Sequence, residues 1–183
     1  MNKKRNIILV GPMGAGKSSV GKRLAQVLDL PFMDTDHEIE ARLKVSISTI
    51  FDVEGEAGFR QREAQVIADL VEHGSRKVLA TGGGAVILPE NRVELKAYGT
   101  VVYLSSSVKQ LVERTRHDTA RPLLQNADPE KVLSELMKIR EPFYREVADI
   151  VLHTERKSIN RVVQEILSAL AQRGWPEAKG VRV

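Results

Sequence analysis

The run Gly11-Pro12-Met13-Gly14-Ala15-Gly16-Lys17-Ser18 has the residue types and spacing of a loop that binds phosphate groups. Small residues let the backbone turn so that successive N–H groups face an anion, and a predicted helix begins where the loop ends. Lys17 can then reach the β- and γ-phosphates of a nucleotide, and the Ser18 hydroxyl is a ligand for Mg²⁺. The alternative is a glycine turn with a surface lysine. The apolar run before the loop and the amphipathic pattern after it favour phosphate binding.

Two carboxylates follow the second predicted strand. Asp34 and Asp36 come directly after the run 31–33, so we expect them at the same sheet edge as the loop. The third predicted strand ends in Thr81, where a phosphate-loop enzyme usually has an acid that holds the water shell of the metal. Asp34 is therefore the expected partner of Ser18 at the metal. The alternative for both acids is a role as simple N-caps of the following helix.

Three consecutive glycines, Gly82, Gly83 and Gly84, follow Thr81. Because glycine has no Cβ, such a stretch lets a substrate approach the backbone closely. A flexible turn is the alternative.

Arginines that could bind a second, anionic substrate occur at three places. Arg60 lies in a mostly helical stretch that could fold back over the sheet edge, and Arg140 lies near the end of a later predicted helix. The segment 114–126 is polar, lacks a hydrophobic period and contains Arg121, so it is predicted to be a mobile lid. Taken alone, Arg60 is typical of a solvated helix residue and Arg140 of a cation at a helix C-terminus.

Five apolar runs alternate with helical patterns along the chain. We expect strands at 7–10, 31–33, 77–80, 100–104 and 150–152, and helices at 17–28, 37–73 with interruptions at 45–48, Gly55 and Gly58, 89–98, 107–114, 128–140 and 158–173. Pro142 should kink or end the helix that contains Arg140. The alternation predicts an α/β fold of three layers, with a five-stranded parallel sheet between helices.

The composition excludes several classes of function. The 183 residues include 28 Lys and Arg against 24 Asp and Glu, which gives a net charge of +4, and there is no cysteine for a disulfide or a thiolate metal site. The basic residues are dispersed and aromatic residues make up 4%, so we expect no nucleic-acid partner. No apolar run is long enough to span a membrane, and the four histidines lack metal-ligand spacing. A cytoplasmic monomer is the default expectation.

These motifs, taken together and in their order, resemble those of the shikimate kinase family. The shared marks are the loop at 11–18, Asp34-Thr35-Asp36, Phe59-Arg60 with Glu63, Thr81 with its three glycines, Arg121-Pro122-Leu123-Leu124, and Arg140 before Pro142-Phe143-Tyr144. The resemblance implies a nucleoside-monophosphate-kinase-like P-loop kinase fold and ATP-dependent phosphorylation of the shikimate 3-hydroxyl on the route to chorismate. The chain length predicts one domain, a kinase domain at 1–174 with a substrate-binding insertion at 34–62 and a lid at 114–126. Gly174 and Pro176 stop the last predicted helix, so the polar tail 175–183 is expected to be disordered.

The same resemblance assigns roles to individual residues. Lys17, Asp36 and Arg121 take the catalytic positions, and Ser18 and Asp34 hold Mg²⁺. The implied shikimate-binding residues are Asp36, Arg60, Gly82, Gly83 and Arg140. The implied ATP-binding residues are Gly14, Ala15, Gly16, Lys17, Ser18, Ser19, Arg114, Arg121 and Lys157. The loop that leads to Ile159 departs from relatives that have proline there.

Two other functions are weighed against this one. Another small-molecule or nucleotide kinase of the same fold could use the arginines to hold a phosphate instead of a carboxylate. A nucleotide switch or nucleic-acid binder is a second alternative, but the chain has no Asn-Lys-x-Asp run for guanine and no basic stripe.

Overall fold

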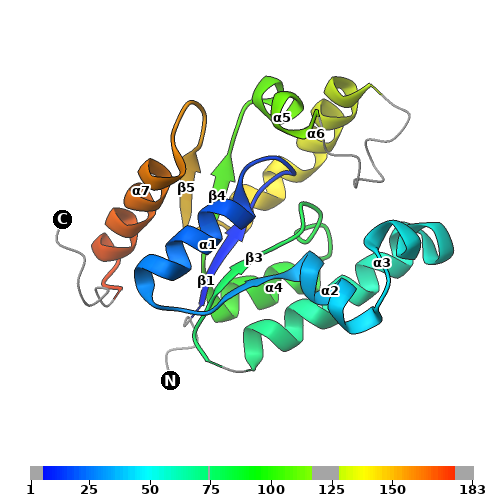
Figure 1. Cartoon of the computed structure of the whole chain (residues 1–183), viewed down its shortest axis with the longest axis horizontal. Helices are drawn as coiled ribbons and strands as arrows, with labels where there is room; N and C mark the ends of the chain where they lie inside the picture. Colours follow the sequence, from blue (N-terminus) through cyan, green and yellow to red (C-terminus); the bar gives the residue numbers. More distant parts are fainter. Residues whose placement is uncertain (1–5, 74, 117–127, 176–183) are drawn as a thin grey trace.

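The structure is a computed structural model and describes residues 6–73, 75–116 and 128–175. Within these ranges, five parallel strands form one sheet in the order β2-β3-β1-β4-β5 (Figure 1). Their bounds are β1 (Asn6–Val10), β2 (Phe32–Asp34), β3 (Val78–Ala80), β4 (Gly99–Ser105) and β5 (Ile150–His153). In the sheet, Ile8 lies opposite Leu79 on one side and Val101 on the other. The predicted parallel sheet is confirmed.

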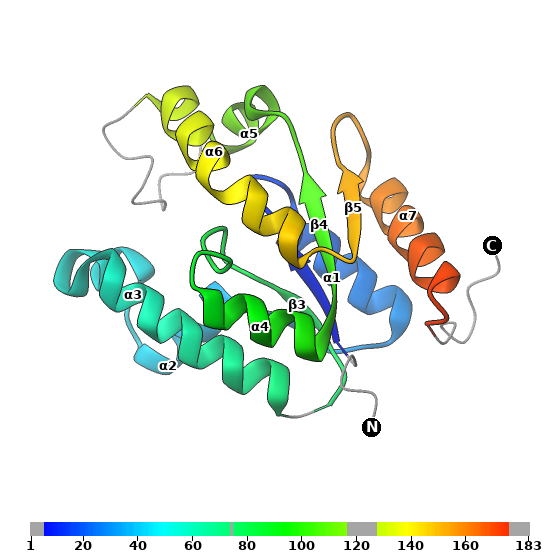
Figure 2. The same ribbon diagram turned by 180° about the vertical axis from the view of Figure 1, so that it is seen from behind.

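Helices cover both faces of the sheet, as Figures 1 and 2 show from opposite sides. They are α1 (Lys17–Leu28), α2 (Thr35–Leu43), α3 (Ile47–Glu72), α4 (Pro89–Tyr98), α5 (Val108–Thr115), α6 (Pro129–Val147) and α7 (Ile159–Gln172). Alternate residues of β1 point to opposite faces. Ile7 and Leu9 pack in a core with α1 and α7, whereas Ile8 and Val10 pack in a core with α3 and α4. The three-layer arrangement is therefore the one predicted.

This topology places the phosphate loop at a position suited to ligand binding. The loop follows β1, which lies between β3 and β4 in the sheet. After β1 the chain first builds β2 and β3 on one side of β1 and then β4 and β5 on the other side. The direction in which strands are added therefore reverses at β1. Open α/β sheets bind ligands outside the carboxyl ends of their strands at such a reversal.

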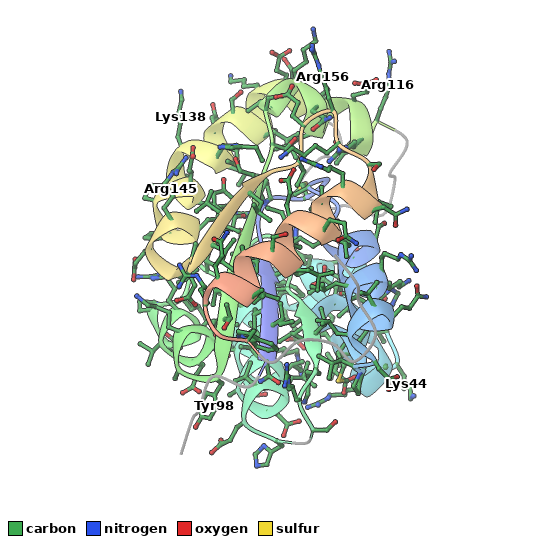
Figure 3. All side chains as sticks on the ribbon, turned by 90° about the vertical axis from the view of Figure 1, so that its left-hand side faces the viewer. Lys44, Tyr98, Arg116, Lys138, Arg145 and Arg156 are labelled. Carbon is green, nitrogen blue, oxygen red and sulfur yellow. The ribbon has the colours of Figure 1, made fainter. Side chains whose placement is uncertain are left out.

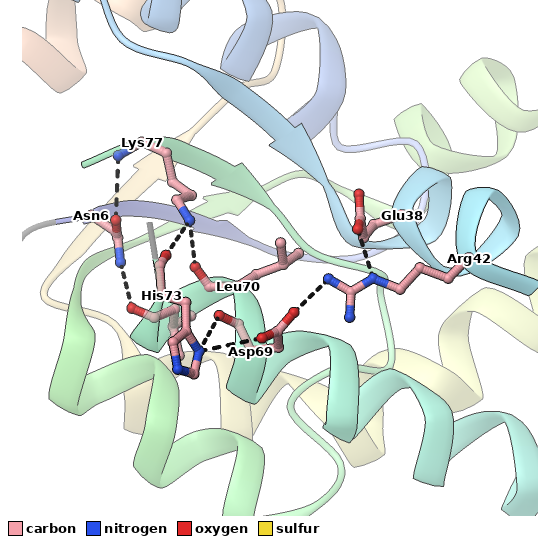
Figure 4. Close-up of polar contacts among 8 residues, drawn as sticks. Asn6, Glu38, Arg42, Asp69, Leu70, His73 and Lys77 are labelled. Atoms are coloured by element: carbon pink, nitrogen blue, oxygen red, sulfur yellow. Dashed lines mark hydrogen bonds and ion pairs between the residues drawn. The ribbon is translucent and has the colours of Figure 1, made fainter. Parts of the chain in front are cut away.

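Ion pairs fix α2 to α3 beside this sheet edge (Figure 4). Arg42 on α2 contacts Glu38 on the same helix and Asp69 on α3, each at 2.6 Å. Since α2 starts directly after Asp34 and α3 carries Arg60, these contacts help to set the distance between the predicted metal and substrate residues.

The predicted helical stretch 37–73 is two helices, with a further break inside α3. Gly55 has φ 68° and ψ −178°, which is outside the helical region and favours glycine. The predicted interruptions at 45–48 and at Gly55 are therefore confirmed. The interruption predicted at Gly58 is wrong, because Gly58 is part of the second helical half of α3.

Pro142 is predicted to kink or end the helix that contains Arg140, and the predicted end is wrong. Helix α6 continues through Pro142 to Val147. Pro142 lies on the exposed side of the helix, as does Lys138, whose carbonyl loses its intrahelical donor. Water can satisfy that carbonyl, so the proline is tolerated there.

The boundaries predicted for the lid and the tail need correction. Arg114 and Thr115 belong to α5, so the predicted lid does not begin at 114. Trp175 belongs to the folded domain, because its indole N–H donates to Thr100 Oγ1 at 2.9 Å and its ring lies 4.1 Å from the Arg76 guanidinium carbon. The rest of the predicted tail, 176–183, and the lid residues 117–126 lie outside the described residues. In the described ranges, no helix has the length and apolarity needed to cross a membrane.

Candidate active site

Glycine is required at several points of the phosphate loop. Gly16 has φ 92° and is the N-cap of α1, and its carbonyl accepts a hydrogen bond from Val20 N at 2.9 Å. Gly11 has φ 146°, and a Cβ there would lie 2.5 Å from the Leu104 carbonyl oxygen. The backbone of the loop therefore has the shape expected of a phosphate cradle at a helix N-terminus.

Lys17 closes this loop on itself. Its ammonium donates to the carbonyl oxygens of Gly11 and Pro12, both at 2.7 Å, and the residue is only 8% exposed. These contacts keep the Lys17 ammonium against the loop that is predicted to bind the phosphates.

Ser18 and Asp34 meet across the edge of the sheet. The Ser18 hydroxyl donates to Asp34 Oδ2 at 2.6 Å, and Asp34 Oδ1 accepts from the backbone N–H of Asp36 at 3.0 Å. Asp34 is thus both the N-cap of α2 and the partner of Ser18. Thr81 instead donates its hydroxyl to the Leu9 carbonyl at 3.2 Å, so no acid occupies that strand end. Hydroxyl and carboxylate oxygens fit Mg²⁺.

Arg114 and Lys157, for which the resemblance implies nucleotide contacts, both line the cavity that the phosphate loop lines. Arg114 donates to the Gly14 carbonyl at 3.2 Å and to the Thr154 carbonyl at 3.5 Å. The Lys157 ammonium pairs with Glu165 at 2.6 Å. Both residues contact a common hollow with Ile159, which is 46% exposed.

One cavity of about 410 Å³ joins most of the predicted site residues. It extends from the phosphate loop past the two acids to the glycine stretch after β3, and on the other side to α7. Its lining residues are Met13, Gly14, Ala15, Gly16, Lys17, Ser18, Ser19, Val20, Asp34, Asp36, Thr81, Gly82, Gly83, Arg114, Thr154, Lys157, Ile159 and Val162.

The glycines after β3 are required by close side-chain packing. A Cβ on Gly82 would lie 2.8 Å from Asp36 Oδ1 and 2.7 Å from Glu63 Oε1, and one on Gly84 would lie 2.1 Å from Arg60 Nη2. No positive φ is involved at any of the three. Gly82 N also donates to Thr35 Oγ1 at 2.9 Å. At Gly82 and Gly84 the close approach is therefore made by side chains of this chain, and the approach of a substrate stays a prediction.

Arg60 is buried between two carboxylates of its own helix. Its Nη1 donates to Glu63 Oε2 at 2.7 Å, and its Nε and Nη2 both donate to Glu56 Oε1, at 3.3 and 3.1 Å. Burial alone would lower the pKa of Arg60, but Glu63 and Glu56 raise it overall. Arg60 is therefore a permanent cation beside the glycine stretch. The other arginine of this segment, Arg62, pairs with Glu54 at the surface.

Glu63 is the most buried carboxylate of this region, with a side chain that is 0% exposed. Burial raises its pKa, Arg60 opposes the rise, and the charge of Asp36 adds to it. Its second oxygen, Oε1, has no hydrogen-bond partner in the described part of the chain.

Arg140 is the second buried guanidinium and is 4% exposed. Its Nη1 lies 3.7 Å from the position of a Cβ on Gly83, so it stands behind the cavity wall. Burial lowers its pKa, and the nearby charge of Arg60 lowers it further. Among the described residues, Arg140 forms no ion pair with a carboxylate. A buried cation of this kind favours an anionic ligand.

Sequence reasoning gave no role to Glu56, Glu63 or Tyr144. Glu56 and Glu63 lie four residues before and three after Arg60, which is the spacing at which helix side chains pair. Tyr144 lies four residues after Arg140, and its hydroxyl donates to the Gly83 carbonyl. Arg121 lies outside the described residues. No cluster of three or more His, Cys, Asp or Glu that could hold a metal occurs in the described ranges.

The chain is similar to known shikimate kinases over most of its length. The family model described as "Shikimate kinase" matches residues 13–171. A shikimate kinase of Pseudomonas syringae pv. tomato is 57% identical over 168 residues, which cover 92% of this chain and 97% of the relative.

Solved structures give the same result. A shikimate kinase from Acinetobacter baumannii in complex with shikimate is 45% identical with a TM-score of 0.90, and the match covers 96% of this chain and 97% of that one. The shikimate kinase of Aquifex aeolicus is 37% identical with a TM-score of 0.80, over 92% and 98% of the two chains. This chain therefore belongs to the shikimate kinase family.

Proposed function

We propose that this protein transfers the γ-phosphoryl group of ATP to the 3-hydroxyl of shikimate and so forms shikimate 3-phosphate for chorismate and aromatic amino acid biosynthesis. One observation carries the proposal: a single cavity runs from the phosphate loop to Asp36, Gly82 and Gly83, with the buried cation of Arg140 behind it. The A. baumannii relative, whose structure holds shikimate, supports the choice of acceptor.

The donor half of the site is the loop with its helix. The backbone N–H groups of the loop and Lys17 bind the phosphates, and Arg114 and Lys157 border the space for the base. Ser18 and Asp34 supply oxygens for Mg²⁺. When bound, Mg²⁺ neutralises charge on the phosphate oxygens during transfer.

The acceptor half uses the insertion 34–62 and the glycine stretch. Shikimate carries one carboxylate and three hydroxyls, so its site needs guanidinium groups for the carboxylate and an acceptor for a hydroxyl. Arg140 and Arg60 provide the cations, and Asp36 provides the hydroxyl acceptor.

Catalysis then consists mainly of positioning and charge neutralisation. Asp36 orients the 3-hydroxyl toward the phosphoryl group, and this role ranks above general-base action because the proton can leave late in a loose transition state. Arg121, which the sequence places in the family's lid, adds positive charge at the transferred group.

The test is an acceptor panel. ADP release is measured by coupled assay with ATP and Mg²⁺ and with shikimate, gluconate or AMP as acceptor. Shikimate should stimulate ADP release far above the other two. Stimulation by gluconate or AMP but not by shikimate would favour another kinase of this fold and overturn the proposal.

A further inference from the structure

Tyr144 connects the core of the domain to the wall of the active-site cavity. It lies on α6 and is 0% exposed. Its hydroxyl donates a hydrogen bond to the carbonyl of Gly83, which lines the cavity. A core side chain therefore holds one peptide group of the proposed acceptor site in a fixed orientation.

The Tyr144 hydroxyl is the donor in its contact with the Gly83 carbonyl. Burial strongly raises its pKa, although the charge of Arg140 opposes the rise. A raised pKa favours the protonated hydroxyl, which is the form that donates to the Gly83 carbonyl.

The same side chain also lies against Arg140. The two residues are four apart on α6 and so share one face of the helix. Arg140 Nη1 is 3.7 Å from the Cβ position of Gly83, and Tyr144 partly offsets the burial that lowers the Arg140 pKa. Arg140, Gly83 and Tyr144 thus form one contact group between α6 and the glycine stretch.

The ring of Tyr144 has a separate role from its hydroxyl. It stacks on Tyr103, with ring centroids 5.0 Å apart and an angle of 25° between the planes. The Tyr103 hydroxyl is buried, and its polar neighbour is Ser105 on the same strand, β4. The two stacked tyrosines therefore differ in what their hydroxyls do.

We propose that Tyr144 is a positioning residue for the acceptor: through its hydroxyl it fixes the Gly83 carbonyl and the Arg140 guanidinium in the geometry that binds the carboxylate of the substrate. The inference rests on the proposed function, in which Gly83 and Arg140 contact shikimate. It predicts that the hydroxyl affects acceptor binding and leaves ATP binding unchanged.

The test is Tyr144→Phe, which keeps the ring and its stacking. We expect the KM for shikimate to rise about tenfold, the size of effect that follows from losing one buried hydrogen bond, while kcat and the KM for ATP change less than about twofold. A merely structural role would lower the amount of folded enzyme and thus kcat, without a selective change in one KM.

Tyr103→Phe is the matched control. It removes a hydroxyl from the same stack and leaves the hydrogen bond between Tyr144 and Gly83 in place, so both KM values should stay unchanged. Equal rises of the shikimate KM in the two variants, or an unchanged shikimate KM in Tyr144→Phe, would overturn the inference.

Arg140→Ala separates this result from a failure of the proposed function. If Arg140→Ala raises the KM for shikimate and Tyr144→Phe does not, only the positioning role fails. If wild-type protein does not phosphorylate shikimate, the proposed function fails, and the same variants are measured with whichever acceptor of the panel it phosphorylates. An unchanged acceptor KM for Tyr144→Phe would again reject the inference.

Discussion

The Lys17 ammonium lies in the phosphate loop without being exposed to bulk solvent. It donates to two carbonyl oxygens of its own loop, those of Gly11 and Pro12. These contacts place the ammonium beside the cavity that the phosphate loop lines. We expect its role to be in the chemical step.

Lys17→Ala should therefore lower kcat by about 10²- to 10³-fold, the loss typical of removing one group that stabilises transition-state charge. Steady-state kinetics measure the loss, and thermal unfolding followed by circular dichroism checks that the fold is retained. Lys22→Ala is the control, because Lys22 is an exposed lysine of the same helix α1. Near-normal turnover of Lys17→Ala would remove the loop lysine from catalysis.

Arg140 should act on binding of the acceptor. Arg140→Ala removes a buried guanidinium with no carboxylate partner among the described residues, so we expect a rise of about 10- to 100-fold in the KM for shikimate with a smaller change in kcat. Arg145→Ala is the matched control on the same helix: Arg145 pairs with Glu141, and Figure 3 shows its side chain directed outward. A fall in kcat at unchanged KM would contradict the binding role.

Helix α3 has charged pairs on both sides of its break at Gly55. Glu54, which precedes the break, pairs with Arg62, which follows it. Glu56 and Arg60 both follow the break and pair with each other. Glu56 Oε1 occupies the Nε and Nη2 donors of Arg60, which form an edge that a carboxylate ligand can bind. If Arg60 binds the acceptor as proposed, we expect Glu56 and the acceptor to compete for these donors.

Glu56→Gln should weaken this competition. We expect the KM for shikimate to fall about threefold, since Glu56 is 48% exposed and a pair of this kind contributes little energy. Kinetics on Glu54→Gln provide the control, because that variant loses the pair with Arg62 and leaves Arg60 unchanged. A KM that stays constant or rises in Glu56→Gln would show that Glu56 does not compete.

The elements that the sequence predicts best are those that depend on one local pattern. The β1 run is apolar throughout because both faces of the strand are buried, and Asp128 and Ser158 cap helices as their types suggest. The predicted helix end at Pro142 is wrong because the effect of a proline depends on which side of the helix is exposed to water. Trp175 is wrongly predicted to belong to the tail because its partners, Thr100 and Arg76, are distant from it in the sequence.

In the candidate site too, some residues can be predicted from a local pattern and others cannot. Spacing alone indicates the phosphate loop, and strand ends indicate Asp34 and Asp36. The partners of Arg60 and the contact of Tyr144 with Gly83 depend on how α3 and α6 pack at the sheet edge, which no local pattern contains.

At the scale of the whole domain, the buried Glu63 should make the free energy of unfolding depend on pH. Its raised pKa means that the folded protein binds the proton more tightly than the unfolded chain does. The contribution of Glu63 to the free energy of unfolding is therefore fully present below the ordinary carboxyl pKa of 4.5 and is lost as the pH rises through the raised folded value.

Glu63→Gln cannot titrate, so the comparison with wild type isolates this effect. The free energy of unfolding of wild type minus that of the variant should decline as pH increases from about 4 to 8, by about 1.4 kcal/mol for each unit by which the folded pKa is raised. Denaturant unfolding at a series of pH values measures the difference. A difference that grows with pH would mean that Arg60 holds the Glu63 pKa below its ordinary value.

In the proposed function, the loop at 11–18 binds ATP while Asp36, Arg60 and Arg140 bind shikimate in the same site. Phosphorus NMR of protein incubated with ATP, Mg²⁺ and shikimate tests it directly. We expect the γ-phosphate signal of ATP to be replaced by a single phosphate monoester coupled to the proton on carbon 3 of shikimate, and Lys17→Ala to abolish the replacement. Formation of inorganic phosphate alone, or of an ester at another hydroxyl, would contradict the proposed function.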